Sequence, residues 1–240
     1  MSMMQSKKKR PEREVKVFKF ESKLEEGVFD RSSLLTLEKF MKKGIIGTLD
    51  YCIAKGKEAN VYLATSKDGG YYAIKIYRLR SPSFLHMEKY IQGDRRFSKS
   101  SHGKQGIIFT WARKEFSNLQ LMAQAGVRSP KPIAFKNNVL AMEFLGKDGV
   151  PYSTLADTGS EDPNEDYRLI LSDVQKLYKA GLVHADVSEY NILMCDDGPY
   201  LIDCGQAVLT SHPSAEEFYK RDLENLRKYF SKYPQFKAED

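Results

Sequence analysis

Hydrophobic and polar residues follow two different periods along the chain, and the first of them is helical. Between residues 31 and 44 the apolar positions recur every three or four residues, as on one face of a helix. Ser32 or Ser33 can cap the start of this helix, and Gly44 stands where a left-handed residue commonly ends one. The apolar stripe of this predicted helix consists of Leu34, Leu35, Leu37, Phe40 and Met41.

From Gly47 onward the period changes to that of β-strands. Three runs rich in β-branched and aromatic residues, 48–54, 59–65 and 71–77, are separated by short turns that contain Gly, Lys and Asp. Turns this short join antiparallel neighbours, so these runs predict a three-stranded antiparallel meander.

The remaining periodic segments predict four helices and two hairpins. Asp162, Pro163 and Glu165 have the order of a helix start, and Ser214 with Glu217 has the pattern of a capping box. The predicted helices are 84–91, 111–125, the segment from Asp162 to Gly181, and the segment from Ser214 onward; the predicted hairpins are 133–144 and 192–201. Pro, Gly, Ser and charged residues in the region of about 92–110 predict a flexible loop.

The composition indicates a globular protein that stays in the cytoplasm. The chain has 240 residues, 41% of them hydrophobic, which suffices for one domain of two lobes. No run approaches the length of a membrane span, and the N-terminus lacks the apolar core of a signal peptide, so we expect no membrane partner. Cys52, Cys195 and Cys204 each lie inside an apolar run, and we expect them to be buried and reduced.

The net charge of +6 is concentrated in two segments. Residues 1–19 contain seven cations and two carboxylates, and residues 78–104 contain the same numbers, so each segment carries +5. Two basic segments on a mildly acidic body suggest contact with a polyanion, with RNA as the first candidate. A solvated tail or loop is the alternative for each. Residues 1–13 have few apolar groups and predict a disordered basic arm.

The candidate chemistry lies between residues 183 and 206. Asp186 is followed five residues later by Asn191, and a strand–turn–strand pattern then leads to Asp203. Phosphoryl transfer needs one carboxylate beside the attacking hydroxyl and oxygen ligands on the metal that holds the phosphates. Asp186 suits the first role, and Asn191 and Asp203 suit the second, with the spacing of the kinase patterns His-Arg-Asp-x-x-x-x-Asn and Asp-Phe-Gly. An ordinary polar hairpin is the alternative.

Three residues of the first half fit the same chemistry. Lys75 ends the run Tyr-Ala-Ile-Lys in an apolar strand, like the strand lysine that reaches the α and β phosphates in kinases, and a buried lysine needs a partner. Glu115, on the helix predicted at 111–125, is the expected ion-pair partner. Aligned on Val61, the preceding turn keeps one glycine of a phosphate-covering loop, Gly56. A lysine and a glutamate that both face solvent, and a plain hairpin, stay open as alternatives.

Together these segments resemble the RIO family of atypical protein kinases, above all its first subfamily. The resemblance is carried by residues 56–62, 73–78, 83–91 and 184–191, and the string His-Ala-Asp-x-Ser-Glu-Tyr-Asn in the last of them is highly specific. It covers roughly residues 45 to 230. Ala185 and Cys204 depart from the general kinase pattern, which has Arg and Phe there. The resemblance implies a trimmed kinase fold that binds ATP with Mg²⁺ or Mn²⁺ and acts in maturation of the small ribosomal subunit.

The resemblance also implies roles for individual residues. Asp186 and Asp203 would be catalytic, and Asn191 and Asp203 would hold the metal. Met142 would guard the nucleotide pocket, while the main chain at Glu143 and Leu145 would contact adenine. The other implied nucleotide contacts are Gly56, Lys57, Val61, Ala73, Lys75, Glu115 and Ile202.

The predicted fold class is therefore α+β, a trimmed two-lobed kinase-like fold. Residues 14–142 would form an N-terminal lobe with an antiparallel sheet and helices, and residues 143–240 a helical C-terminal lobe. Only 35 residues follow Gly205, so we expect no activation loop and no peptide-binding helices. We expect an ATP- and magnesium-dependent serine/threonine kinase or ATPase that acts on a pre-small-subunit ribosomal particle and contacts rRNA through its basic segments. The alternative is an RNA-binding assembly protein whose nucleotide site is mainly structural.

Overall fold

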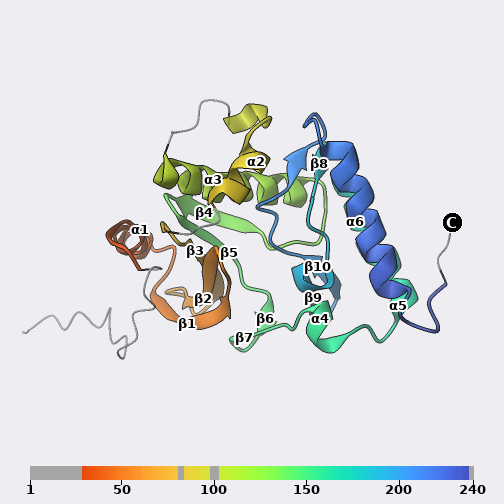
Figure 1. Cartoon of the computed structure of the whole chain (residues 1–240). Helices are drawn as coiled ribbons and strands as arrows, with labels where there is room; N and C mark the ends of the chain where they lie inside the picture. Colours follow the sequence, from red (N-terminus) through yellow and green to blue (C-terminus); the bar gives the residue numbers. More distant parts are fainter. Residues whose placement is uncertain (1–28, 81–83, 98–102, 238–240) are drawn as a thin grey trace, which may run out of the picture.

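One five-stranded antiparallel sheet, in the order β1-β2-β3-β5-β4, forms the first half of the fold. It is described by a computed structural model that covers residues 29–80, 84–97 and 103–237 (Figure 1). The predicted basic arm at 1–13 lies outside the described residues. The sheet strands are β1 (Thr48–Lys55), β2 (Ala59–Thr65), β3 (Tyr71–Tyr77), β4 (Pro132–Lys136) and β5 (Val139–Glu143).

The predicted three-stranded meander is confirmed, and the second predicted hairpin extends it. β5 pairs with β3, so that Lys75 lies opposite Leu140 on one side and opposite Val61 on the other. Successive side chains of a strand point to opposite faces of a sheet. Ile74 and Ile76 accordingly pack in the cluster that contains residues of α1, while Lys75 between them faces α3.

Helices pack against the sheet, and two long helices, α5 and α6, lie in the second half of the chain (Figure 1). The α-helices are α1 (Arg31–Lys42), α2 (Phe84–Ile91), α3 (Lys104–Gln124), α4 (Leu155–Thr158), α5 (Pro163–Lys179) and α6 (Ala215–Phe230). Two single turns of 3₁₀-helix are η1 (Arg95–Phe97) and η2 (Glu189–Asn191). The short strands of the second half are β6 (Gly146–Lys147), β7 (Val150–Pro151), β8 (Leu182–Val183), β9 (Ile192–Cys195), β10 (Gly198–Leu201) and β11 (Val208–Leu209).

The start of α1 differs from the prediction, because Asp30 caps the helix. Its Oδ1 accepts a hydrogen bond from the Ser33 amide at 2.9 Å. Ser33 itself is completely buried, and its hydroxyl accepts a bond from Asn138 Nδ2 at 2.7 Å. The Ser33 hydroxyl, which we predicted as a possible helix cap, therefore packs against the β4–β5 turn instead. Gly44 does adopt the predicted left-handed backbone, with a φ of 73°.

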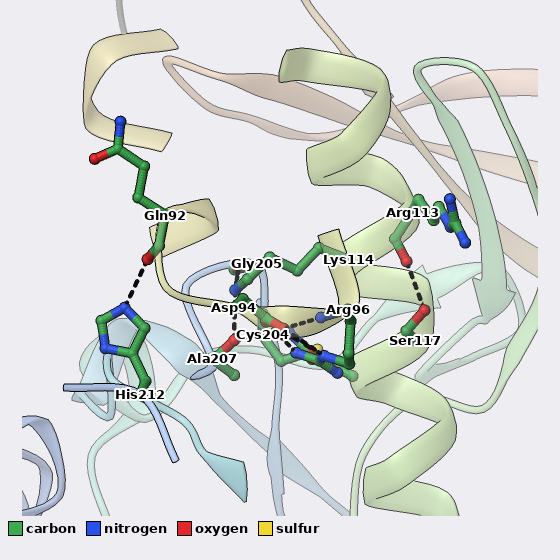
Figure 2. A network of polar contacts seen from close by, with 11 residues as sticks. Gln92, Asp94, Arg96, Arg113, Lys114, Ser117, Cys204, Gly205, Ala207 and His212 are labelled. Carbon is green, nitrogen blue, oxygen red and sulfur yellow. Dashed lines mark hydrogen bonds and ion pairs between the residues drawn. The ribbon is translucent and has the colours of Figure 1, made fainter. Parts of the chain in front are cut away.

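α3 begins at Lys104, seven residues before the predicted start at Trp111. The predicted loop at 92–110 was therefore too long: residues 98–102 lie outside the described residues, and 104–110 are helical. Ile108 is fully buried in this added part of the helix. On the other side of the gap, the buried carboxylate of Asp94 accepts bonds from the guanidinium of Arg96, the shortest at 2.7 Å (Figure 2).

In the second half, α5 and α6 pack against each other beside the β9–β10 hairpin (Figure 1). α5 starts as predicted, because Asp162 Oδ1 accepts from the Glu165 amide at 3.1 Å. α6 also starts as predicted, but the capping-box prediction was wrong, since the Ser214 side chain makes no capping bond. The Ser214 amide instead donates to His212 Nδ1 at 3.2 Å, which fixes the entry into the helix.

One hydrophobic cluster crosses the predicted boundary between residues 142 and 143. It joins Leu119 and Met122 of α3 and Leu140 of β5 to residues of α5 and α6, so α3 packs on both halves of the chain. The three cysteines are free, as predicted. Only Cys204 is buried, whereas Cys52 and Cys195 are partly exposed, which corrects the prediction for these two. Within the described residues no helix is long and apolar enough to cross a membrane.

Candidate active site

Lys75 joins two carboxylates that come from opposite halves of the chain. Its Nζ lies 2.8 Å from Glu115 Oε1 on α3 and 2.9 Å from Asp203 Oδ1 after β10. The side chains of Lys75 and Glu115 are almost completely buried, whereas 51% of the Asp203 side chain is exposed. The predicted Lys75–Glu115 ion pair is thus present in the structure. The exposed part of Asp203 is free to face a ligand in the solvent.

The charges of this triad follow from burial and mutual attraction. Burial by itself would lower the pKa of Lys75, but the carboxylates of Asp203 and Glu115 outweigh it and raise that pKa, so the lysine is charged. Burial raises the pKa of Glu115 to about 7, against the attraction of Lys75. For Asp203, Lys75 outweighs the effect of burial and lowers the pKa of its carboxyl, so Asp203 is ionised.

Asp186 and Asn191 lie together on the loop that follows β8. Asn191 Nδ2 donates to Asp186 Oδ2 and to the Asp186 carbonyl, both at 2.9 Å. Gln206 Nε2 donates to the same carboxylate oxygen at 3.1 Å. Burial and the nearby Asp203 carboxylate raise the pKa of Asp186 to about 6, and the bond from Asn191 opposes this rise. The two acids predicted to be catalytic therefore influence each other.

α6 fixes the backbone of this loop. Ala185 adopts a left-handed conformation, with a φ of 66°, which is uncommon for a residue other than glycine. Asp222 Oδ2 accepts from the Ala185 amide at 2.7 Å and Asp222 Oδ1 from the Val187 amide at 3.0 Å, while Arg221 Nη2 donates to the Ala185 carbonyl at 2.7 Å. These bonds fix the peptides on both sides of Asp186. They also hold Ala185 in its sparsely populated conformation.

The β1–β2 turn lies close to the same acids. The Gly56 amide donates to the Ala59 carbonyl at 2.9 Å, and a Cβ at Gly56 would lie 2.9 Å from that oxygen, so the tight turn requires glycine. Glu58 in this turn is half-buried. Burial raises the pKa of its carboxyl, and Asp203 and Asp186 add to the rise. Lys57 is exposed at the turn.

The segment after β5 contains the residues predicted to contact the nucleotide base. Met142 lies opposite Ala73 of β3, and Ala73 is buried. The Glu143 amide donates to the Lys131 carbonyl at 2.8 Å. The Leu145 carbonyl accepts from the Tyr152 amide at 3.1 Å, so this carbonyl is already used within the protein.

On the other half of the chain, Ile202 directly precedes Asp203 and is partly exposed. Its amide donates to the Asn191 carbonyl at 3.0 Å. This bond ties the segment that carries Asp203 to the end of the loop that carries Asp186.

Sequence reasoning missed several residues that hold the site. On α3 the apolar residues Trp111, Leu119 and Met122 recur with helical spacing, and positions three and four residues from these lie on the same face. That spacing marks Lys114 and Asn118, beside the predicted Glu115, as buried polar residues, and all three are at most 1% exposed. Asp222, Arg221 and Gln206 gave no comparable signal, since acids, arginines and glutamines are common on helix surfaces and in loops.

The donor set suits Mg²⁺ bound together with phosphates. Within the described part of the chain no group of three or more His, Cys, Asp or Glu side chains could hold a metal ion alone. Mg²⁺ usually takes one or two carboxylates and completes its octahedron with water and substrate phosphate oxygens. The half-exposed Asp203 carboxylate and the Asn191 amide, whose nitrogen bonds Asp186, supply hard oxygen ligands of this kind.

These features define the class of protein. A strand lysine paired with a helix glutamate, an Asp–Asn loop and a later aspartate at the end of a hairpin are together the site of a protein-kinase-like fold. The RIO domain profile matches residues 60–239. The chain belongs to the RIO family of atypical serine/threonine protein kinases.

Individual relatives agree with this assignment. The RIO-type serine/threonine-protein kinase Rio1 of Haloferax volcanii is 41% identical over 208 residues, which cover 87% of this chain and 72% of that protein. The serine/threonine-protein kinase RIO1 of Saccharomyces cerevisiae is 37% identical over 236 residues, covering 86% of this chain. The chain matches 49% of the length of this yeast relative.

Solved structures share the fold. The crystal structure of the Rio2 kinase–ADP/Mg²⁺–phosphoaspartate complex from Chaetomium thermophilum superimposes with a TM-score of 0.66. The match covers 86% of this chain and 62% of that chain, at 22% identity. This likeness confirms the predicted trimmed kinase-like α+β fold.

Proposed function

We propose that this chain is an ATP- and Mg²⁺-dependent enzyme that transfers the γ-phosphoryl group of ATP to a serine or threonine hydroxyl or to water. The observation that carries this proposal is the position of Lys75 Nζ, 2.8 Å from Glu115 and 2.9 Å from Asp203. A purely structural site would have no need for a buried lysine that joins acids from both halves of the chain. Burying such charges is favourable only with good geometry, and it serves phosphate binding directly.

Asp186 is the group that we assign to the acceptor. In the transfer, the acceptor oxygen forms a bond to the γ-phosphorus, the bond from that phosphorus to the ADP oxygen breaks, and the acceptor proton passes to the Asp186 carboxylate. Asn191 and Gln206 both bond Oδ2 of this carboxylate. These bonds fix the orientation of the carboxylate and therefore the direction from which it accepts the proton.

Asp203 and Asn191 are the residues that would hold the metal. When bound, Mg²⁺ supplies charge neutralisation at the β and γ phosphates. Lys75 contributes a fixed positive charge beside the same position, and Glu115 keeps the lysine from turning away. These side chains thus bind and orient the phosphates, while Asp186 moves the proton.

The adenine would bind beside the segment after β5. Because the Leu145 carbonyl is bonded to Tyr152, the Leu145 amide is the main-chain group that we assign to the base, together with the Glu143 carbonyl. Apolar contacts to the base would come from Met142 and Ala73, which lie opposite each other on neighbouring strands. Val61 and Ile202 would add contacts from the two sides, and Gly56 and Lys57 would lie over the phosphates.

Hydrolysis is the outcome that we favour as the main reaction, with Asp203 as a transient phosphoryl acceptor. The ionised Asp203 carboxylate forms a bond to the γ-phosphorus while the bond from that phosphorus to the ADP oxygen breaks. Water then attacks the acyl phosphate, its proton passes to Asp186, and the products are phosphate and the free Asp203 carboxylate. The described chain passes from Asp203 to the start of α6 at Ala215 within residues 204–214, which leaves no segment there on which to seat a peptide. Asp203 is ionised and half-exposed, as a nucleophilic carboxylate must be. A phosphoaspartate occurs in the Rio2 kinase complex to which this fold is similar.

We further propose that the enzyme acts in the cytoplasm on a pre-small-subunit ribosomal particle and contacts its rRNA. The three free cysteines suit a reducing compartment. The family resemblance of residues 184–191 supports the ribosomal role. Two cations of the basic segment 78–104 are already used within the protein, because Arg96 pairs with Asp94 and Arg78 Nη2 donates to Asn60 Oδ1 at 2.9 Å. The basic segment 1–19 is therefore the stronger candidate for RNA contact.

The test separates binding from turnover. Asp186→Asn should leave Mg²⁺-ATP affinity within about twofold and lower ATP turnover at least about a hundredfold, the low end for a lost acid–base group. Calorimetry and phosphate release measure the two quantities. The matched control is Asp197→Asn, an exposed acid on the β9–β10 turn, which should change neither. Full turnover in Asp186→Asn would overturn the assignment of Asp186. If the wild-type protein itself binds Mg²⁺-ATP but does not turn it over, a structural nucleotide site is favoured.

A further inference from the structure

The segment directly after Asp203 is fastened to α3 by a buried lysine. Lys114 is completely buried, and its Nζ donates to the Gly205 carbonyl at 2.8 Å and to the Ala207 carbonyl (Figure 2). Among the described residues it has no carboxylate within ion-pair distance, and burial lowers its pKa to about 7. A fully buried lysine is rare and unfavourable unless its donors are satisfied. The two carbonyl contacts are what satisfies this one.

Asn118, one turn further along α3, contacts the same segment. Its Nδ2 donates to the Cys204 carbonyl at 2.8 Å and to the Ala207 carbonyl at 3.1 Å, and the residue is completely buried. Together with Lys114 it binds three carbonyls within four consecutive residues. Residues 204–207, which we name the anchored segment, therefore have their main chain turned toward α3.

Trp111 brings the anchored segment still closer to the same helix. A Cβ at Gly205 would lie 2.8 Å from Trp111 Nε1, so the backbone approaches the indole to a distance that only glycine permits. Lys114 Nζ lies 5.3 Å from the centre of the Trp111 ring. The anchored segment is thus held by two sets of polar contacts and by direct packing on one helical face.

We infer that Lys114 and Asn118 are positioning residues, which fasten the anchored segment to α3 and thereby set the place of Asp203 relative to Lys75. Glu115, the immediate neighbour of Lys114, holds Lys75 at 2.8 Å. One turn of α3 thus holds both Lys75 and the peptides that follow Asp203. Asp203 has a φ of 58°, a conformation that persists in a residue other than glycine only when its surroundings impose it.

This inference rests on the proposed function for its consequence, because the position of Asp203 matters to Mg²⁺-ATP. Loosening the anchored segment should impair the metal-dependent part of nucleotide binding, while contacts of the base on the other side of the site are unaffected. A purely structural role of Lys114 would instead lower stability without changing the metal requirement. The two possibilities therefore differ in measurable quantities.

The variants are Lys114→Met and Asn118→Leu, which keep the approximate side-chain shapes and remove the donors. Trp111 is the only tryptophan of the chain, so its fluorescence reports on the anchored segment without any ligand. In the ligand-free variants we expect acrylamide quenching of Trp111 to rise about twofold and amide exchange in residues 204–207 to quicken at least about tenfold, as for a local opening. The Mg²⁺ concentration for half-maximal ATP binding should rise about tenfold, with metal-free nucleotide affinity unchanged.

Two controls match these variants. Ser117→Ala alters a neighbouring residue whose hydroxyl, among the described residues, bonds only the Arg113 carbonyl of its own helix at 3.0 Å, and it should behave as wild type (Figure 2). Leu37→Ala destabilises the separate cluster under α1, and it should lower the melting temperature without altering exchange at 204–207. Should Lys114→Met fail to fold, Gly205→Ala tests the same anchoring, because its Cβ would displace the segment from Trp111.

Wild-type quenching and wild-type exchange in Asn118→Leu and Gly205→Ala would overturn the anchoring. The positioning role would be overturned by an unchanged Mg²⁺ requirement in variants whose segment has opened, or by the same shift in Leu37→Ala. If the wild-type protein shows no Mg²⁺-dependent nucleotide binding at all, the proposed function fails, while the ligand-free fluorescence and exchange measurements still decide whether Lys114 and Asn118 anchor the segment.

Discussion

Lys75 and Glu115 form an ion pair with 2.8 Å between Nζ and Oε1, and their side chains are only 8% and 1% exposed. Breaking a buried pair by removing one partner is strongly destabilising, because the other charge stays buried without compensation. Lys75→Met should therefore lower the free energy of unfolding by about 3 to 5 kcal/mol. Urea denaturation at pH 8 measures the change.

The double variant Lys75→Met, Glu115→Leu removes both buried charges. It should recover at least about half of the stability lost in Lys75→Met, since buried pairs replaced by apolar residues are often neutral. It should also bind ATP more weakly than wild type, because no cation remains at the phosphate position. If the double variant is less stable than Lys75→Met, the buried charge of Glu115 is not the cause of the loss.

If Asp203 accepts the phosphoryl group, an acyl phosphate should form on its side chain. With γ-labelled ATP and Mg²⁺, the protein should carry label that neutral hydroxylamine releases, because hydroxylamine attacks acyl phosphates and leaves serine phosphates intact. Asp203→Asn should lose this label, and it should also lose the effect of Mg²⁺ on ATP affinity, since a metal ligand acts in the ground state. Asp197→Asn provides the control. Label that survives hydroxylamine, in both wild type and Asp203→Asn, would assign the transfer to a hydroxyl.

Because His184 is buried, we expect the free energy of unfolding to depend on pH in a specific way. The ring is 1% exposed, both ring nitrogens lack a hydrogen-bond partner among the described residues, and burial lowers its pKa to about 4 from 6.5. Between these values the unfolded chain binds a proton that the folded protein does not, so stability is full above pH 6.5 and falls as the pH drops toward 4. The loss amounts to about 3 kcal/mol for this residue.

Comparison with His184→Gln isolates this contribution. Glu115, Asp186 and Asp222 have raised pKa values, which favour the folded state as the pH falls, but they do so in both proteins. The difference in unfolding free energy between wild type and His184→Gln should shrink by about 3 kcal/mol from pH 7 to pH 4. A difference independent of pH would show that the pKa of His184 is the same in the folded and the unfolded protein.

The proposed RNA contact is tested by its salt dependence. Each neutralised phosphate of single-stranded RNA contributes about −0.7 to the slope of log affinity against log salt concentration. Deleting residues 1–13 removes five cations, so the slope should become shallower by up to about 3.5 units, while ATP turnover in isolation stays unchanged. Filter binding to small-subunit rRNA measures the slope. An unchanged slope would show that the arm remains solvated in the complex.

Sequence alone was sufficient for features that are local. The strands at 59–65 and 71–77, the cap at Asp162 and the hairpin that leads to Asp203 follow from side-chain period and turn chemistry over a few residues. The spacing of Asp186, Asn191 and Asp203 was enough to predict the groups that we assign to phosphoryl transfer, because one loop and one hairpin fix their separation.

Only the tertiary structure decided which polar residues hold those groups in place. Lys114 lies 91 residues from Gly205, and Asp222 lies 37 from Ala185, so no local pattern links them. Asp30 caps α1 in place of the predicted serine, because the Ser33 hydroxyl bonds Asn138, which lies 105 residues away in the sequence. A buried polar group must find a partner, and long-range packing determines which partners are within reach. The sequence thus determined which polar residues lie in the loop and the hairpin, and the packing of α3 and α6 determined their geometry.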